Sequence, residues 1–146
     1  MVATAHRISR GSDFDRTLKT GVRVTTPDLV IHVLPLIGSD DRRGDPRSTG
    51  IATVGGPWLG LIVSKAVGNA VIRHRVARRL RAAFMHNRDS YPSSQTMTVI
   101  RARPSAAELS SVALGTQLVE ALSRRRVREA FESTGATGQT ASRVLP

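Results

Sequence analysis

The chain contains no cysteine and very few aromatic residues. Among its 146 residues, Phe, Trp and Tyr together make up only 3%. The absence of cysteine excludes disulfide bonds, thiolate metal sites and a thiol nucleophile. At this length we expect one domain with a modest hydrophobic core. The apolar content of 40% favours such a globular domain over a disordered basic tail.

Long apolar runs are missing as well. The uninterrupted apolar stretches are only a few residues long, whereas a membrane-spanning helix needs roughly 20 apolar residues. The segment from Met1 to Ser9 has no apolar core of signal-peptide length. We therefore expect a soluble, cytoplasmic protein with no membrane partner.

Acidic residues are absent where basic residues are dense. The chain has 22 Lys and Arg against 11 Asp and Glu, a net charge of +11. Between Asp45 and Asp89 there is no acidic residue, and the window carries a net +8. Its cations are Arg47, Lys65, Arg73, Arg75, Arg78, Arg79, Arg81 and Arg88. A run without interspersed acids repels itself unless a counter-charge is present, so it predicts a polyanionic partner such as nucleic acid.

Apolar periodicity and turn residues predict the secondary structure. We expect a short helix over 9–20 that is capped by Ser12 and ends at Gly21. A final helix is expected to begin at Ser105, with Glu108 completing a capping box, and to run to about residue 131. Between them, strands are predicted over 21–25, 29–34, 58–64 and 96–102, and a helix over 69–86. Within 29–34, Leu29, Ile31 and Val33 would share one face of the sheet, and Val30, His32 and Leu34 the other.

This order of elements predicts an α+β fold with one domain over residues 1–132. The strand–helix–strand segment from 58 to 102 makes it a split βαβ sandwich. Gly, Pro, Ser and mixed charges dominate 38–57, which is expected to be an exposed loop insertion. The tail over 133–146 has the composition of a disordered segment.

The predicted helix over 69–86 has one apolar and one basic side. At about 100° per residue, one side gathers Ile72, Val76, Leu80, Ala83 and Phe84. The opposite side gathers His74, Arg75, Arg78 and Arg81, with Arg73 and Arg79 at the margins. Lys65 lies just before the helix, Gly68 permits a turn, and Asn69 is a suitable N-cap. This helix is therefore the expected polyanion site.

Other functions are poorly supported by the sequence. The four histidines lack metal-site spacing, and neither a G-x-S-x-G nor an H-E-x-x-H motif occurs, so we assign no catalytic residue and no metal ligand. A P-loop is absent too. A ribosomal or other structural RNA-binding protein remains the alternative, because such a protein would share the charge and the basic helix. A DNA-binding regulator is disfavoured because strands flank the helix, and a membrane-surface helix because the apolar side must cover the sheet.

The stretch LGLIVSKAVGNAVIRHRVARRLRAAF, from Leu59 to Phe84, resembles the signature of the bacterial ribonuclease P protein subunit. That family carries S-K-x-x-G-x-A-V after a strand, followed by a basic block. The match here begins at Ser64, and its basic block is Arg73-His74-Arg75. The resemblance covers about residues 6–128.

The resemblance implies an α-β-β-β-α-β-α sandwich, a ribosomal-protein-like domain, with a βαβ crossover through the basic helix. It implies an accessory subunit of ribonuclease P (EC 3.1.26.5), a ribonucleoprotein that removes the 5′ leader from precursor tRNA. The catalysis, with its Mg²⁺, would belong to the RNA subunit. The expected partners are that RNA and the leader, not DNA.

The resemblance also implies roles for individual residues. The RNA-binding positions would be Lys65, Asn69, Arg73, His74, Arg75, Arg78, Arg79 and Arg81. A leader cleft would contain Phe14, Leu18 and His32. Three departures matter: His74 replaces an Asn, Ala77 replaces a common Lys, and Leu18 and His32 occupy positions that are often aromatic. With fewer rings available for stacking, charge is expected to carry more of the leader binding.

Overall fold

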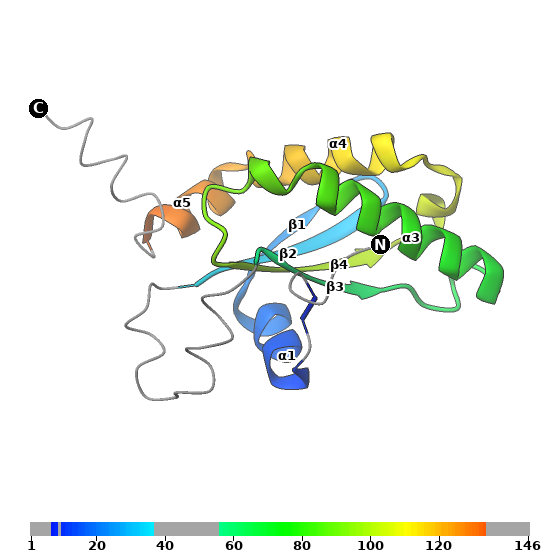
Figure 1. The fold of residues 1–146 in the computed structure, drawn as a ribbon, viewed down its shortest axis with the longest axis horizontal. Coiled ribbons are helices and arrows are strands. Elements are labelled where there is room, and N and C mark those ends of the chain that lie inside the picture. Colours follow the sequence, from blue (N-terminus) through cyan, green and yellow to red (C-terminus); the bar gives the residue numbers. More distant parts are fainter. Residues whose placement is uncertain (1–6, 9, 37–55, 134–146) are drawn as a thin grey trace, which may run out of the picture.

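The structure, a computed structural model, describes residues 7–8, 10–36 and 56–133 (Figure 1). One four-stranded sheet has the order β1-β2-β4-β3, with β3 parallel to β4 and the other pairs antiparallel. The strands are β1 (Val22–Thr25), β2 (Leu29–Pro35), β3 (Trp58–Ile62) and β4 (Thr96–Ala102). The helices are α1 (Gly11–Thr20), α3 (Ala70–His86), α4 (Ser111–Leu122) and α5 (Arg125–Ser133), with short 3₁₀ turns over Arg88–Ser90 and Pro104–Glu108. The α+β prediction and the β3-α3-β4 crossover are confirmed.

Helices α3, α4 and α5 cover one face of the sheet, which we call the helix face, and pack the main core against it (Figure 1). From β2, Leu29, Ile31 and Val33 point into this core and are fully buried, as the alternation predicts. Phe84 of α3 and Phe131 of α5 are the largest fully buried side chains. Burying such rings stabilises the fold by roughly 2–3 kcal/mol each.

Helix α1 lies on the opposite face of the sheet, which we call the strand face (Figure 1). Its buried Thr17 donates a hydrogen bond from Oγ1 to the Asp13 carbonyl at 2.8 Å, and the sulfur of Met97 lies 3.7 Å from the same oxygen. Met97 packs there with Trp58 and Leu36 in a second, smaller core. The predicted end of the helix is confirmed, because the Gly21 amide donates to the Thr17 carbonyl at 2.9 Å. A Cβ at Gly21 would lie 2.6 Å from that oxygen, so this close turn requires glycine.

The single long helix predicted from Ser105 to about residue 131 is wrong. Ser105 and Glu108 lie in a 3₁₀ turn and are exposed, so they form no capping box. The backbone is extended at Leu109, and the Ser110 side chain caps α4 by accepting from the Ala113 amide at 3.1 Å. A second break in the predicted helix separates α4, which ends at Leu122, from α5, which begins at Arg125. Ser110 thus offers the backbone a better N-cap than the one the motif suggested.

Five other boundaries differ from the prediction. Helix α1 begins with Arg10 at its N-cap and has no side-chain cap, so Ser12 lies inside its first turn. Strand β1 begins one residue later and β2 ends one residue later than predicted, and β3 ends at Ile62. Helix α3 also begins one residue later than predicted, because Asn69 is its N-cap. Most of the predicted loop over 38–57 and of the predicted tail over 133–146 lies outside the described residues.

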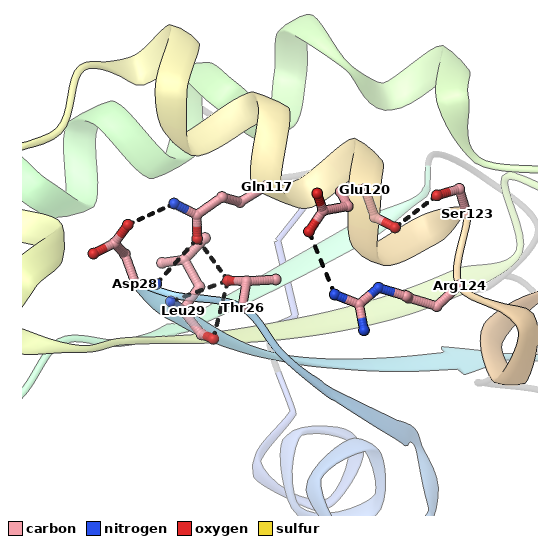
Figure 2. A network of polar contacts seen from close by, with 7 residues as sticks. All are labelled: Thr26, Asp28, Leu29, Gln117, Glu120, Ser123 and Arg124. Atoms are coloured by element: carbon pink, nitrogen blue, oxygen red, sulfur yellow. Dashed lines mark hydrogen bonds and ion pairs between the residues drawn. The ribbon is translucent and has the colours of Figure 1, made fainter.

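Gln117 of α4 ties the β1–β2 turn to the helix layer (Figure 2). Its Oε1 accepts from the Thr26 hydroxyl at 2.6 Å and from the Asp28 amide at 3.2 Å. Its Nε2 donates to the Asp28 carboxylate at 2.7 Å. Each polar atom of this side-chain amide is therefore satisfied, and the turn is fixed over α4.

Candidate nucleic-acid interface

The chain between β3 and α3 positions the start of the basic helix. The amides of Val67 and Gly68 donate to the carbonyls of Ser64 and Lys65, at 3.0 and 3.2 Å. A Cβ at Gly68 would lie within 3.0 Å of the Ile72 side chain, so the turn can approach the helix only with glycine. Lys65 is exposed beside the N-terminus of α3.

Asn69 is the N-cap of α3, as predicted. Its side-chain oxygen accepts a hydrogen bond from the Ile72 amide at 3.0 Å. Because this oxygen satisfies one of the free amides of the first turn, the residue first of all stabilises the helix. Its side-chain NH₂ group remains available to a ligand.

The sides of α3 follow the predicted wheel in part. Arg75 and Arg81, predicted on the outer side, are half-buried, and so is Ile72 of the predicted apolar side. Val76, Leu80, Ala83 and Phe84 are buried against the sheet. His74 and Arg78 are exposed on the outer side. Four residues between these sides are half-buried: Arg73, Arg75, Arg79 and Arg81. The arginine stems therefore pack along the fold, and the guanidinium groups reach its surface.

One arginine of α3 has a structural partner. Arg79 donates from Nη1 to the Leu109 carbonyl at 3.0 Å, which links α3 to the segment before α4. By contrast, the Nε atoms of Arg73 and Arg75 are buried and have no hydrogen-bond partner among the described residues. No α3 arginine forms an ion pair within that same part of the chain. Within the described residues, the positive charge of this helix thus has no counter-charge.

Phe14 and Arg81, predicted to belong to the leader cleft and to the RNA-binding helix respectively, line one small hollow. The Phe14 ring packs over Gly60, where an added Cβ would lie 2.6 Å from its Cε2 atom. The hollow measures about 180 Å³, and Arg7 and Leu61 also line it. Leu18 is half-buried on α1 but does not line this hollow. An aromatic ring beside two guanidinium groups is suited to a nucleotide.

His32 lies on the strand face, opposite Arg23 of β1 and Val99 of β4. It is only 9% exposed, and its Nδ1 atom has no hydrogen-bond partner within the described residues. Burial is the main cause that lowers the pKa of His32, and the positive charges of Arg23 and Arg101 add to it. The imidazole is therefore neutral at pH 7.

Three cations near these residues were not predicted as site residues: Arg7, Arg23 and Arg101. A signal for Arg23 was available, because Val22 and Val24 point toward the core and leave Arg23 on the face of His32. Arg101 follows the same alternation in β4. Arg7 could not be found in this way, because it meets β3 through an isolated bridge to Leu59.

Two further observations limit the chemistry of the described part of the chain. It contains no group of three His, Cys, Asp or Glu side chains that could hold a metal ion. Within it, none of the helices has the length and apolar character needed to span a bilayer.

Comparison with known proteins identifies the family. The family model described as Ribonuclease P matches residues 2–126. The chain belongs to the ribonuclease P protein family. The ribonuclease P protein component of Nocardia farcinica is 44% identical over 124 residues, covering 81% of this chain and 79% of that protein. That of Mycobacteroides abscessus is 43% identical, with coverage of 88% and 94%.

Solved structures of ribonuclease P proteins have the same fold. The Staphylococcus aureus protein superimposes with a TM-score of 0.60 at 22% identity, over 86% of this chain and 97% of that one. The Thermotoga maritima protein gives 0.58 at 18% identity, over 79% and 93%. At these identities the likeness concerns the fold alone.

Family membership confirms the resemblance drawn from the motif at Ser64. This ribonuclease P subunit has a role in tRNA 5′ processing and is an accessory subunit of the enzyme (EC 3.1.26.5). Ribonuclease P is a ribonucleoprotein, so the family implies an RNA partner. The alternative of a ribosomal protein without a role in cleavage is set aside.

Proposed function

We propose that this subunit binds the ribonuclease P RNA through the outer side of α3 and the turn before it. The observation that carries the proposal is the set of α3 guanidinium groups without an acidic partner among the described residues. Arginine suits this role because its planar fork donates two hydrogen bonds to one phosphate. The proposed contacts are Lys65, Asn69, Arg73, His74, Arg75, Arg78, Arg79 and Arg81.

The 5′ leader of precursor tRNA is proposed to lie between α1 and the strand face. Phe14 offers a ring for stacking, and Leu18 and His32 belong to the same side of the molecule. Arg81 belongs to both proposed surfaces, since it projects from α3 and lines the Phe14 hollow. A single RNA-binding surface can therefore run from α3 to the leader cleft.

The chemical step is proposed to belong to the RNA subunit. Because the described residues contain no metal-binding cluster, no protein ligand for Mg²⁺ is assigned. Mg²⁺ bound by the RNA would supply the activated water, and the protein would offset phosphate repulsion with its cations. We place the protein in the cytoplasm.

Reconstitution tests this proposal. The purified protein alone should not cut precursor tRNA. When it is added to ribonuclease P RNA at low Mg²⁺, 5′ maturation should be restored, because the protein's positive charge replaces part of the screening that the metal supplies. The measurement is the rate of leader release with and without protein. A rate that protein does not raise at any Mg²⁺ concentration would refute the proposed function.

A further inference from the structure

A groove of about 550 Å³ lies between α3 and α4, which run side by side over the helix face of the sheet (Figure 1). Two small buried residues, Ala83 and Gly115, form its floor. A Cβ added at Gly115 would lie 3.6 Å from the Cβ of Ala83, so the two helices approach closely at this point. Because neither floor residue has a large side chain, the space above them stays open.

Apolar side chains are exposed at this groove. Among the described residues only three large apolar side chains are exposed, and two of them, Val112 (77% exposed) and Val119 (37%), line the groove. They are seven residues apart on α4 and therefore share one side of that helix. The described lining contains no Asp, Glu, Lys or Arg. Two exposed valines beside one uncharged groove indicate a contact surface rather than scattered apolar residues.

The groove continues the proposed RNA-binding side of α3. At about 100° per residue, Arg75, Arg78, Ala82 and His86 fall within about 80° of one another. Ala82 and His86 line the groove, and Arg78 lies one helical turn before Ala82. Arg75 and Arg78 have no acidic partner in the described part of the chain. Unpaired positive charge therefore leads directly into an apolar hollow.

This combination of charge and apolar surface selects the chemistry of the partner. A second copy of the chain would bring two sets of unpaired α3 arginines together, and their repulsion disfavours it. An acidic protein helix could meet the arginines, but the family implies an RNA partner. An unpaired nucleotide offers a flat base for the groove and a phosphate for a guanidinium group. Paired bases are less suited, because they are stacked inside a double helix.

We propose that the groove between α3 and α4 holds an unpaired base of the ribonuclease P RNA, with a neighbouring phosphate on Arg78. This inference rests on the proposed function and deepens it, because it adds a base contact to the phosphate contacts of α3. The base belongs to the RNA subunit and lies on the helix face, away from the leader. Phosphate contacts fix the position of an RNA, whereas a seated base also fixes which nucleotide lies there.

Salt dependence separates this apolar contact from the phosphate contacts. Val112→Ser with Val119→Ser should weaken binding to ribonuclease P RNA about tenfold, because the groove loses its apolar walls. The slope of log affinity against log salt should not change, since no cation is removed. Arg75→Ala with Arg78→Ala should lower both the affinity and the slope. Filter binding across a series of KCl concentrations measures both quantities.

Matched variants and chemical probing identify the contact. Val112→Leu with Val119→Leu keeps the lining apolar and should bind within about threefold of wild type. Val112→Ser alone changes one exposed side chain, so it should keep the wild-type urea midpoint and still weaken binding. Dimethyl sulfate and a carbodiimide report unpaired bases in the bound RNA. At least one base that the wild-type protein protects should become reactive with the serine pair.

The outcomes separate the two proposals. If the serine pair binds RNA as the wild type does while the arginine pair does not, the base site is refuted, a partner other than RNA covers the groove, and the proposed function stands. The base site is also refuted if the serine pair changes the salt slope as the arginine pair does, or if no base changes its reactivity. If the wild-type protein neither binds the RNA nor stimulates cleavage, both proposals fail.

Discussion

Two helical regions of this protein are rich in arginine, but they differ in whether acidic side chains pair with those arginines. Helix α3 has five arginines and no acidic residue over its 17 residues. The chain at α5 has four, at Arg124, Arg125, Arg126 and Arg128, but here acids are spaced to meet two of them. Arg124 lies 3.4 Å from Glu120 (Figure 2), and Arg125 lies 3.1 Å from Glu129. Both pairs are four residues apart.

This difference in the placement of acids gives the two helices different local electrostatic potentials. Exposed pairs at i and i+4 stabilise a helix by only about 0.3–0.5 kcal/mol, but they lower its local positive potential. The arginines of α3 forgo that small stabilisation. Their full charge is therefore available to phosphate groups, where each contact releases bound counterions.

The largest effect should come from removing unpaired charge on α3. Arg75→Ala with Arg78→Ala should weaken binding to ribonuclease P RNA by about a hundredfold, because each charge-assisted hydrogen bond contributes roughly 1.5–3 kcal/mol. The dependence of affinity on salt should become less steep by about two units of slope. Filter binding across a series of KCl concentrations measures both quantities.

The control for this variant lies on the other basic helix. Arg124→Ala with Arg125→Ala removes equal charge from residues that already have acidic partners, and should change the affinity less than about threefold. An equal loss of RNA affinity for both double variants would contradict the proposed difference between the two helices. An unchanged salt slope for the α3 pair would contradict the placement of the site.

A smaller effect, on stability, should distinguish two neighbouring arginines within α3. Arg79→Ala removes the donor to the Leu109 carbonyl, and should lower the free energy of unfolding by roughly 1.5–3 kcal/mol. Arg78→Ala, an identical change at an exposed position one residue away, should stay within about 0.5 kcal/mol of wild type. Urea unfolding of the two variants gives the comparison. Equal stabilities would mean that the Arg79 hydrogen bond does not hold α4 in place.

The smallest effect should be a change of stability with pH that depends on His32. The pKa of this residue responds to the positive charges near it on the strand face. Its pKa is lowered from the usual 6.5, so below that pH the unfolded chain binds a proton that the folded protein resists. The stability that neutral His32 contributes is therefore present above pH 6.5 and decreases as the pH falls below it. Urea midpoints from pH 5 to 7.5 should show this decrease, and His32→Gln should reduce it.

The same histidine offers a spectroscopic check. In an NMR titration, Arg23→Ala should raise the pKa of His32 toward 6.5, because a repelling charge is removed. The α5 variant Arg126→Ala should leave the pKa of His32 unchanged. A His32 pKa that stays the same in Arg23→Ala would show that the charge of Arg23 does not contribute to lowering it.

The sequence predicted most of this architecture because local signals and tertiary packing agree in it. The alternation in 29–34 and the cap at Asn69 both reappear in the structure. The prediction of one long last helix was wrong because Ser105 and Glu108 satisfy only a local motif. The start of α4 is set instead by the Ser110 cap and by the contact of Arg79 with Leu109. A contact 30 residues apart leaves no local pattern in the sequence.

The candidate site was predictable to a similar degree. Charge spacing located the basic residues of α3, and the motif at Ser64 indicated the ribonuclease P protein family, which the family model confirms. That Phe14 and Arg81 line the same hollow was not predictable, because it depends on how α1 lies across Gly60. The pairing of Arg23 with His32 depends on strand register, and the hydrogen bonds of Gln117 to the turn at Thr26 to Asp28 come from a residue far along the chain.

Strand order also constrains how the chain can fold as it is made. Strand β4 lies between β2 and β3 but is the last of the four in the sequence. Until Thr96–Ala102 leaves the ribosome, β3 has no neighbouring strand and the apolar side of α3 has no complete sheet to cover. The sheet therefore closes in one late step that joins distant segments, and such long-range closure is slow. The arginines of α3 emerge before that step, so their charge is exposed to RNA before the domain has closed.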